Sequence, residues 1–223
     1  MIRCVMFDFG NVIGIFDTFR WYRFIAAYSG NCLKPEEMFS GSLVSNIFDF
    51  DRGIIDGDEF YGRTRAAYRI SVPNKADFYK KFIEILRIDY EMLGVVKDLK
   101  ARGIITILVT NMNQIHAEHI GEKYPEIFAS FDYLMISSRE GIAKPDLGAF
   151  TLPLGWAGIE AGESILVDDS ILNIRAACGL GIKGWHYGVT DARWCMNGML
   201  DEERLRLKNH FKILDGAGLL YKK

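Results

Sequence analysis

Residues 4–12 read CVMFDFGNV, a short apolar run that ends at Asp8. Four apolar residues in a row, one of them the β-branched Val5, are typical of a strand buried on both faces of a parallel sheet. Asp8 comes directly after this run, so its carboxylate would lie at the carboxyl end of the strand. Open α/β sheets bind their ligands along that edge. The stretch therefore predicts the first strand of a parallel sheet and a functional carboxylate at its end.

Further apolar runs rich in β-branched residues recur along the chain, with amphipathic segments between them. We expect the additional strands at residues 104–109, 133–136, 165–167 and 182–187. The intervening patterns predict helices at residues 90–102 and 170–178, ended by Gly103 and Gly179, and a last amphipathic helix at residues 201–214. Strands that alternate with helices are joined by right-handed crossovers, which predicts an α/β fold with a doubly wound parallel sheet.

Residues 18–89 interrupt this alternation, because they are helical in pattern and contain no convincing strand. We therefore expect a core made of residues 1–17 and 90–223, with a small helical insertion of residues 18–89 after the first strand. Trp21 and Tyr22 of the insertion could line a substrate pocket. Aromatic residues at helical spacing belong more often to a core, so both interpretations stay open.

The composition excludes several classes of protein. The chain has 223 residues, of which 49% are hydrophobic and 25% charged, as in an ordinary globular protein. A formal net charge of −2 offers no broad attraction to nucleic acid or to anionic lipid. The sequence shows no signal peptide, no membrane-length apolar stretch and no paired cysteine motif. We expect a cytoplasmic monomer or homodimer with reduced thiols.

Polar residues follow two more of the predicted strands. Asp168 and Asp169 come after one strand, and Thr110 and Asn111 come after another. Together with Asp8 these carboxylates would converge at one edge and repel each other unless a cation such as Mg²⁺ lies between them. A hydroxyl beside free backbone N–H groups is suited to hold phosphate oxygens. The ordinary alternative is that the aspartates and Thr110 only cap the helices that follow.

Lys144 lies in the loop EGIAKPD, directly before Pro145. Its ammonium could balance carboxylate and phosphate charge at the same edge, although a single loop lysine is usually solvated. The order of Asp8, Thr110, Lys144 and then the pair of aspartates is what makes the set specific, because each follows an element that ends at the same predicted edge.

In that order, FDFGNV, ILVTN, GIAKPD and ILVDDS with Asn173 resemble the four sequence motifs of haloacid dehalogenase-like hydrolases. The helical insertion resembles the cap domain of that superfamily. Residues 50–60, FDRGIIDGDEF, are similar to the cap helix of its small sugar-phosphate phosphatases and of the N-terminal phosphatases of epoxide hydrolases. The resemblance extends over roughly residues 2–189.

The resemblance implies a Mg²⁺-dependent phosphatase that acts on a small phosphorylated metabolite, with sugar phosphates as the leading class. Asp8 would be the nucleophile that forms an aspartyl-phosphate, which water then hydrolyses. The resemblance further implies that Mg²⁺ is held by Asp8, by the backbone carbonyl of Gly10, and by Asp168 and Asp169.

The phosphate group, by the same resemblance, would be held by Thr110, Asn111 and Lys144, and Lys144 would also take part in catalysis. Positioning and neutralisation of charge would then supply most of the rate enhancement.

Gly10 departs from the pattern of the phosphatases, which typically carry a second aspartate there as general acid and base. Loss of such a group costs about 10²- to 10⁴-fold in rate. Two alternatives therefore stay open: a weak or silent binding protein that keeps the fold, and a 2-haloacid dehalogenase, which also lacks the second aspartate. The retained pair Asp168 and Asp169 favours the phosphatase over the dehalogenase.

Overall fold

The computed structural model describes residues 1–29, 42–71, 74–187 and 197–220, except for the side chains of residues 22, 42–43 and 197–204. Its centre is a five-stranded parallel sheet with the order β5-β4-β1-β6-β7. The strands are β1 (Cys4–Phe7), β4 (Ile105–Thr110), β5 (Tyr133–Ile136), β6 (Ser164–Asp168) and β7 (Lys183–His186). From β1 the chain adds β4 and β5 on one side of the sheet and then β6 and β7 on the other side. This strand order confirms the predicted doubly wound α/β fold.

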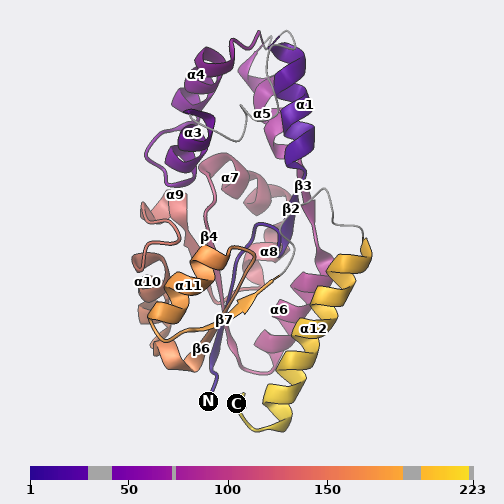
Figure 1. Ribbon diagram of the computed structural model, residues 1–223, viewed down its shortest axis with the longest axis vertical. Coiled ribbons are helices and arrows are strands. Elements are labelled where there is room, and N and C mark those ends of the chain that lie inside the picture. The colour runs from indigo at the N-terminus through magenta and orange to yellow at the C-terminus, as the bar shows by residue number, and fades with distance from the viewer. Residues whose placement is uncertain (30–41, 72–73, 188–196, 221–223) are drawn as a thin grey trace.

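Helices cover both faces of this sheet (Figure 1). One face carries α6 (Tyr90–Ala101), α7 (Gln114–Lys123), α8 (Pro125–Ala129) and α12 (Asn197–Gly216). The other face carries α10 (Gly148–Ala157) and α11 (Ile171–Gly179), while α9 (Ser137–Glu140) and the short turn η1 (Ala161–Glu163) lie in the connections.

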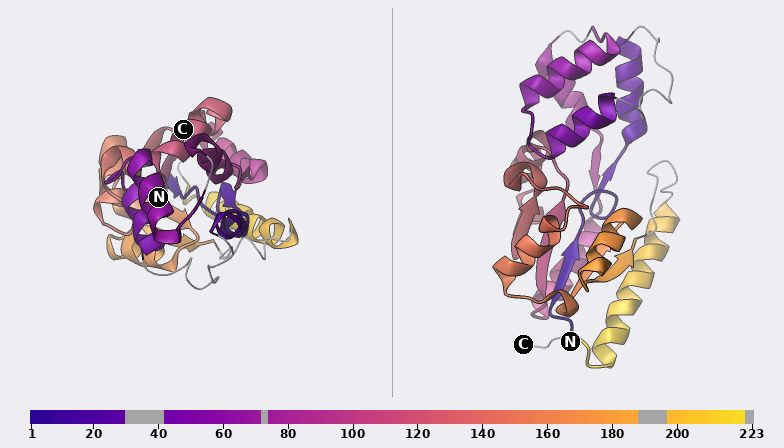
Figure 2. Two further views of the ribbon diagram at one scale, coloured as in Figure 1. Left: turned by 90° about the horizontal axis from the view of Figure 1, so that it is seen from above. Right: turned by 60° about the vertical axis from the view of Figure 1, so that its left-hand side comes forward.

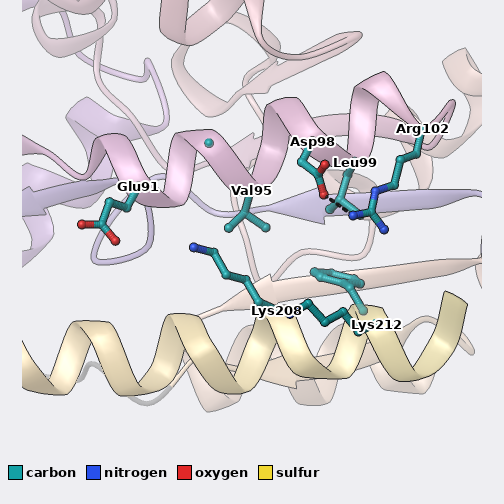
Figure 3. Close-up of a pocket in the computed structure, with 9 residues that line it drawn as sticks. Glu91, Val95, Asp98, Leu99, Arg102, Lys208 and Lys212 are labelled. Atoms are coloured by element: carbon teal, nitrogen blue, oxygen red, sulfur yellow. Dashed lines mark ion pairs between the residues drawn. The ribbon is translucent and has the colours of Figure 1, made fainter. Parts of the chain in front are cut away.

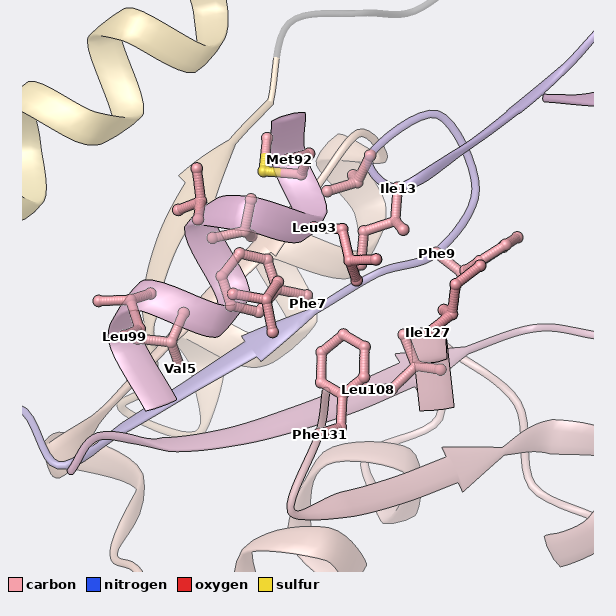
Figure 4. Packing of buried hydrophobic residues seen from close by; sticks show 14 of the residues in the cluster. Val5, Phe7, Phe9, Ile13, Met92, Leu93, Leu99, Leu108, Ile127 and Phe131 are labelled. Carbon is pink, nitrogen blue, oxygen red and sulfur yellow. The ribbon is translucent and has the colours of Figure 1, made fainter. Parts of the chain in front are cut away.

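Strand β1 shows why its whole length is apolar. Val5 and Phe7 point into the larger hydrophobic core, which Figure 4 shows between the sheet and α6. Cys4 and Met6 point into the second core, beneath α10 and α11. Because successive side chains of a strand point to opposite faces, a strand covered on both faces must be apolar at every position. This burial fixes the strand, and with it the place where Asp8 leaves the sheet.

A second, two-stranded sheet was not predicted. It consists of β2 (Gly14–Phe16) and β3 (Leu86–Ile88), which pair antiparallel with Gly14 opposite Ile88. The prediction that residues 18–89 contain no strand was therefore wrong at β3. Three residues are too few to establish an alternating pattern, so only the pairing of distant segments reveals these strands.

Between β2 and β3 lie the helices α1 (Thr18–Tyr28), α3 (Ser42–Asp51), α4 (Gly57–Tyr68) and α5 (Lys75–Ile83). They pack on a hydrophobic cluster of their own and stand beyond the carboxyl ends of the parallel strands (Figures 1 and 2). At its centre Phe50 stacks on Phe60 with ring centroids 4.5 Å apart. We call these four helices the helical insertion.

The stretch 50–60 is not one helix, in contrast to the likeness to a cap helix. Helix α3 ends at Asp51, and α4 begins at Gly57. Gly53 has a φ of +73°, and the Asp56 side chain accepts a hydrogen bond from the backbone N–H of Glu59. A left-handed glycine and an N-cap aspartate interrupt a helix and start a new one, so the stretch forms a turn between two helices.

The predicted end is correct for one helix and wrong for another. Helix α6 ends before Gly103, which has a φ of +83° as expected for a helix terminus. Helix α11 instead continues through Gly179, and the left-handed residue is Gly181. In the described part of the chain, no helix is both long and apolar enough to cross a membrane.

Candidate active site

Asp8 leaves the sheet between its two neighbouring strands. Its backbone N–H donates to the carbonyl of Val167, 2.9 Å away, so the β1–β6 pairing extends to this residue. Its side chain is 11% exposed, and Oδ1 accepts a hydrogen bond of 2.6 Å from the backbone N–H of Phe9. The carboxylate is thereby fixed at the predicted edge of the sheet.

Lys144 joins two of the predicted carboxylates. Its Nζ lies 2.8 Å from Asp8 Oδ1 and 2.6 Å from Asp168 Oδ2, and the lysine side chain is only 1% exposed. Burial by itself lowers the pKa of the lysine, but the charges of Asp8 and Asp168 outweigh it and raise the pKa above its usual value. Lys144 is therefore a buried cation and not a solvated loop lysine.

Asp168 ends β6 and is fully buried. Asn173 Nδ2 donates to both of its carboxylate oxygens, at 2.9 and 3.2 Å, and the backbone N–H of Ser170 donates to Oδ1 at 2.8 Å. Asp169 accepts a 2.8 Å hydrogen bond from Asn11, a residue in the left-handed region with a φ of 54°. The turn after β1 thus supports the second aspartate, and helix capping alone does not account for this network.

Oxygen atoms of Asp8, Asp168 and Asp169 lie within 4.8 Å of one another. Burial raises the pKa of Asp8 to about 7; the charge of Lys144 acts against this rise, and the charges of Asp168 and Asp169 add to it. Burial also raises the pKa of Asp169. Three carboxylates against one lysine leave an excess of negative charge, and this donor set fits a hard divalent cation such as Mg²⁺.

We expect Asp8→Asn to make the metal-free protein more stable near pH 8, by at least about 1 kcal/mol, and to bring little gain near pH 4. Asp8 ionises above about 4 when unfolded but only above about 7 when folded. In that window the folded state binds more protons, so the free energy of unfolding falls as the pH rises. An amide removes this loss. Urea unfolding in EDTA at the two pH values measures the difference, and an equal gain at both would contradict the explanation.

Thr110 and Asn111 follow as predicted at the end of β4. Thr110 is 2% exposed and lines a cavity above the sheet edge. The Asn111 side chain is used within the protein, because its Nδ2 donates to the carbonyl of Lys144 at 2.9 Å and its Oδ1 accepts from the N–H of Lys144 at 2.8 Å. This amide therefore holds the lysine loop, so both of its polar atoms already have partners within the protein.

The cavity above Thr110 has a volume of about 300 Å³ and is shared between the sheet edge and the helical insertion. Gly10, Thr110 and Asn111 lie on the side of the sheet. Its apolar lining comprises Phe9, Phe16, Trp21, Ile47, Phe82, Ile85 and Met112. Trp21 belongs both to the hydrophobic core of the insertion and to the wall of this cavity. A place in the core and a place in a cavity wall are therefore compatible for this residue. The side chain of Tyr22 lies outside the described residues.

The sequence did not point to Asp51 and Asn113, two polar residues that line this cavity. Asp51 of α3 accepts a 2.8 Å hydrogen bond from Asn113 Nδ2, and Asn113 contacts the buried ring of His116. Asn113 follows Thr110 by three residues, so its place after a predicted strand end could have indicated it. Asp51 comes from the insertion, and only the folded chain shows that it reaches the site.

A second cavity, of about 320 Å³, lies between α6 and α12 (Figure 3). It is lined by ends of charged side chains, among them Asp98 and Arg102, which form an ion pair of 2.8 Å. The clustered carboxylates themselves line neither cavity. Although this cavity is slightly larger, Gly10, Thr110 and Asn111 from the predicted site line the other one.

Residues 2–181 match the family model described as haloacid dehalogenase-like hydrolase. The chain belongs to this family. It is therefore a hydrolase, and the edge at which Asp8, Lys144 and Asp168 meet lies within the matched region.

Several curated relatives share part of the chain. The sesquiterpene phosphatase astK of Aspergillus oryzae is 29% identical over 64% of this chain and 71% of its own length. The drimenol cyclase drtB of Aspergillus calidoustus is 25% identical over 82% of this chain, which spans only 33% of that protein.

Solved structures show the same fold. The HAD family enzyme BT-2542 of Bacteroides thetaiotaomicron superposes with a TM-score of 0.75 at 23% identity, over 85% of this chain and 95% of that one. A complex of the same enzyme with magnesium and inorganic phosphate gives 0.74 at 23% identity, over 86% and 96%. The L-2-haloacid dehalogenase of Xanthobacter autotrophicus gives 0.54 at 14%, over 82% and 76%.

Proposed function

We propose that the protein is a Mg²⁺-dependent phosphatase that hydrolyses a small phosphomonoester through an aspartyl-phosphate. The observation that carries this proposal is the cluster in which Lys144 Nζ lies 2.8 Å from Asp8 and 2.6 Å from Asp168, with Asp169 completing the group of carboxylates. The phosphatase astK and the family enzyme that binds magnesium and phosphate support the same chemistry.

The residues divide the reaction between them. A carboxylate oxygen of Asp8 attacks phosphorus, so an O–P bond forms to Asp8 while the bond from phosphorus to the alcohol oxygen breaks. Lys144 and the Thr110 hydroxyl hold the phosphoryl oxygens, and the main chain of Asn111 assists them. Water then attacks the aspartyl-phosphate, which releases phosphate and restores the carboxylate. Mg²⁺ at Asp8, Gly10, Asp168 and Asp169 would neutralise negative charge during both steps.

The lining of the cavity adds a preference for the organic part of the substrate. Seven of the fifteen lining residues are aromatic or aliphatic, among them Trp21, Ile47 and Phe82, and most of the exposed surface of the cavity is apolar. Such a wall buries apolar surface favourably, whereas sugar hydroxyls buried against it would lose hydrogen bonds to water. We therefore favour the phosphate ester of an apolar alcohol over a sugar phosphate, in line with the sesquiterpene phosphatase relative.

Phosphate release from a panel of farnesyl, other aliphatic and hexose monophosphates tests this function. With Mg²⁺ we expect kcat/KM at least about 10-fold higher for the apolar esters, from burial of a few methylene groups, and no turnover in EDTA. Release of halide from 2-haloacids without Mg²⁺ would instead indicate a dehalogenase, and a protein silent on every ester would refute the proposal.

A matched pair of variants separates the cavity wall from the surface of the same helix. Ile47 lines the cavity, whereas Phe48 is 61% exposed. We expect Ile47→Gln to raise KM for farnesyl monophosphate several-fold, because the amide loses hydrogen bonds to water when the ester binds. Phe48→Gln should leave KM unchanged. Equal effects of the two substitutions would show that the ester does not bind against α3.

A further inference from the structure

Gly10 leaves the cavity without the carboxyl group that usually transfers protons in this family. The cavity nevertheless contains a carboxyl group, because Asp51 at the end of α3 lines it together with Gly10 and Thr110. Gly10 and Asp51 are 41 residues apart in the sequence, so the sequence alone does not place them together.

Asp51 is tied to the loop that follows Thr110. Its carboxylate accepts from Asn113 Nδ2 at 2.8 Å. Its backbone carbonyl accepts from the Ser137 hydroxyl, and Ser137 Oγ in turn accepts from the N–H of Met112 at 2.9 Å. These contacts hold the Asp51 side chain next to the segment that carries Thr110, although Asp51 belongs to the helical insertion.

The packing around the same turn is tight. A Cβ at Gly53 would come within 2.5 Å of the carbonyl oxygen of Ser138, so the end of α3 rests closely on α9. Arg52 forms an exposed ion pair of 2.6 Å with Asp146 of the core. The end of α3 is therefore anchored to the core at several points, which limits the positions that Asp51 can take.

The surroundings of Asp51 suit a group that gains and loses a proton. Its hydrogen-bond partner, the Asn113 amide, is neutral, and burial raises the pKa of Asp51 to about 7. The nearby His116 is buried, and its pKa is lowered to about 4, so it is neutral as well. The charged Arg52 is engaged with Asp146. A carboxyl group in such a place is present in both protonation states near neutral pH, as general acid–base catalysis requires.

We propose that Asp51 is the general acid and base of the reaction and replaces, from the helical insertion, the side chain missing at Gly10. Protonated Asp51 gives its proton to the alcohol oxygen as that oxygen leaves phosphorus and Asp8 takes its place. Ionised Asp51 then removes a proton from the water that attacks the aspartyl-phosphate, which returns Asp51 to its protonated form. This inference rests on the proposed phosphatase function.

The variant Asp51→Asn tests the role through its dependence on the leaving group. Asparagine keeps an oxygen that can accept from Asn113, but it cannot donate a carboxyl proton. In single turnovers with Mg²⁺ we expect release of an aliphatic alcohol to slow by about 10²-fold or more. Release of 4-nitrophenol from its phosphate should change by only a few-fold, because that leaving group needs no proton. Equal slowing of both substrates, or of neither, would overturn the proposal.

The matched control is Asp49→Asn on the same helix, where the carboxylate pairs with Arg63 at 3.0 Å. We expect this variant to behave as the wild type with both substrates. Phosphate release by the wild-type protein, with Asp8→Asn as the inactive reference, distinguishes failure of the phosphatase proposal from failure of the Asp51 proposal. A wild type that releases no phosphate refutes the phosphatase function itself, whereas an active wild type with an unaffected Asp51→Asn refutes only the role of Asp51.

A second site provides rescue. A Cβ built at Gly10 would meet only Phe16 Cε2, at 3.8 Å, which is an ordinary contact, so the backbone at this position leaves room for a side chain to begin. We expect Asp51→Asn with Gly10→Asp to regain at least about 10-fold of the lost rate on the aliphatic ester, because the acid returns from the other side of the cavity. A folded double variant that stays as slow as Asp51→Asn would contradict a role in proton transfer and indicate a structural one.

Discussion

Replacing Asp8 by asparagine is expected to reduce phosphate release by at least about 10⁴-fold, because an amide cannot form the covalent bond to phosphorus. The backbone N–H of Phe9 and Lys144 Nζ, both within 2.8 Å of Oδ1, hold the side chain in one position, as the proposed attack requires. Steady-state release of phosphate from the preferred ester, at saturating Mg²⁺, measures the loss.

The fall in activity can be separated from unfolding. The amide removes a carboxylate whose pKa burial has raised to about 7, so the variant should be at least as stable as the wild type at neutral pH. Asp98→Asn is a suitable control, because Asp98 is 59% exposed and pairs with Arg102 on the surface. An Asp8→Asn protein that keeps more than about 1% of the wild-type rate would indicate direct attack by water.

Lys144→Met is expected to lower the free energy of unfolding of the metal-free protein by about 3–5 kcal/mol. The substitution leaves Asp8 and Asp168 buried beside each other without their cation. Phosphate release should fall as well, because the phosphoryl group loses its charged partner. Urea unfolding at pH 7 in EDTA gives the first quantity, and the assay described above gives the second.

Added Mg²⁺ should recover part of the stability lost in Lys144→Met, because a cation among the carboxylates reduces the same repulsion. Lys97→Met is the matched control, since Lys97 is exposed on α6 and its replacement should change stability by less than about 0.5 kcal/mol. A loss below about 1 kcal/mol in Lys144→Met would mean that the aspartates are protonated or hydrated in the folded protein.

The sequence predicted the parts of the site that depend on strand ends. Asp8 and Asp168 follow or end strands that are buried on both faces, and such strands are visible as continuous apolar runs. Once the strands are parallel, their carboxyl ends must lie along one edge, so the approach of Asp8 to Asp168 follows from topology. Lys144 lies in a loop, and only its place in an ordered set of motifs indicated it.

What the sequence did not predict depends on contacts between distant segments. The strands β2 and β3 are three residues each and stabilise one another only as a pair. The turn within residues 50–60 brings Asp51 to Asn113, and no local pattern encodes that approach. The Asn111 side chain is engaged with the backbone of Lys144, 33 residues away, so its role also becomes clear only in the folded chain.

The ribbon formed by β2 and β3 has a consequence for how new specificities can arise. The segment that enters the insertion and the segment that follows it lie next to each other. The N–H of Asp17 donates to the carbonyl of Ile85, and the N–H of Asp89 donates to the carbonyl of Ile13. A segment grafted between these strands would change neither the order of the parallel strands nor any crossover. Recombination at this ribbon could therefore exchange one pocket for another while inheriting Asp8 and its neighbours unchanged.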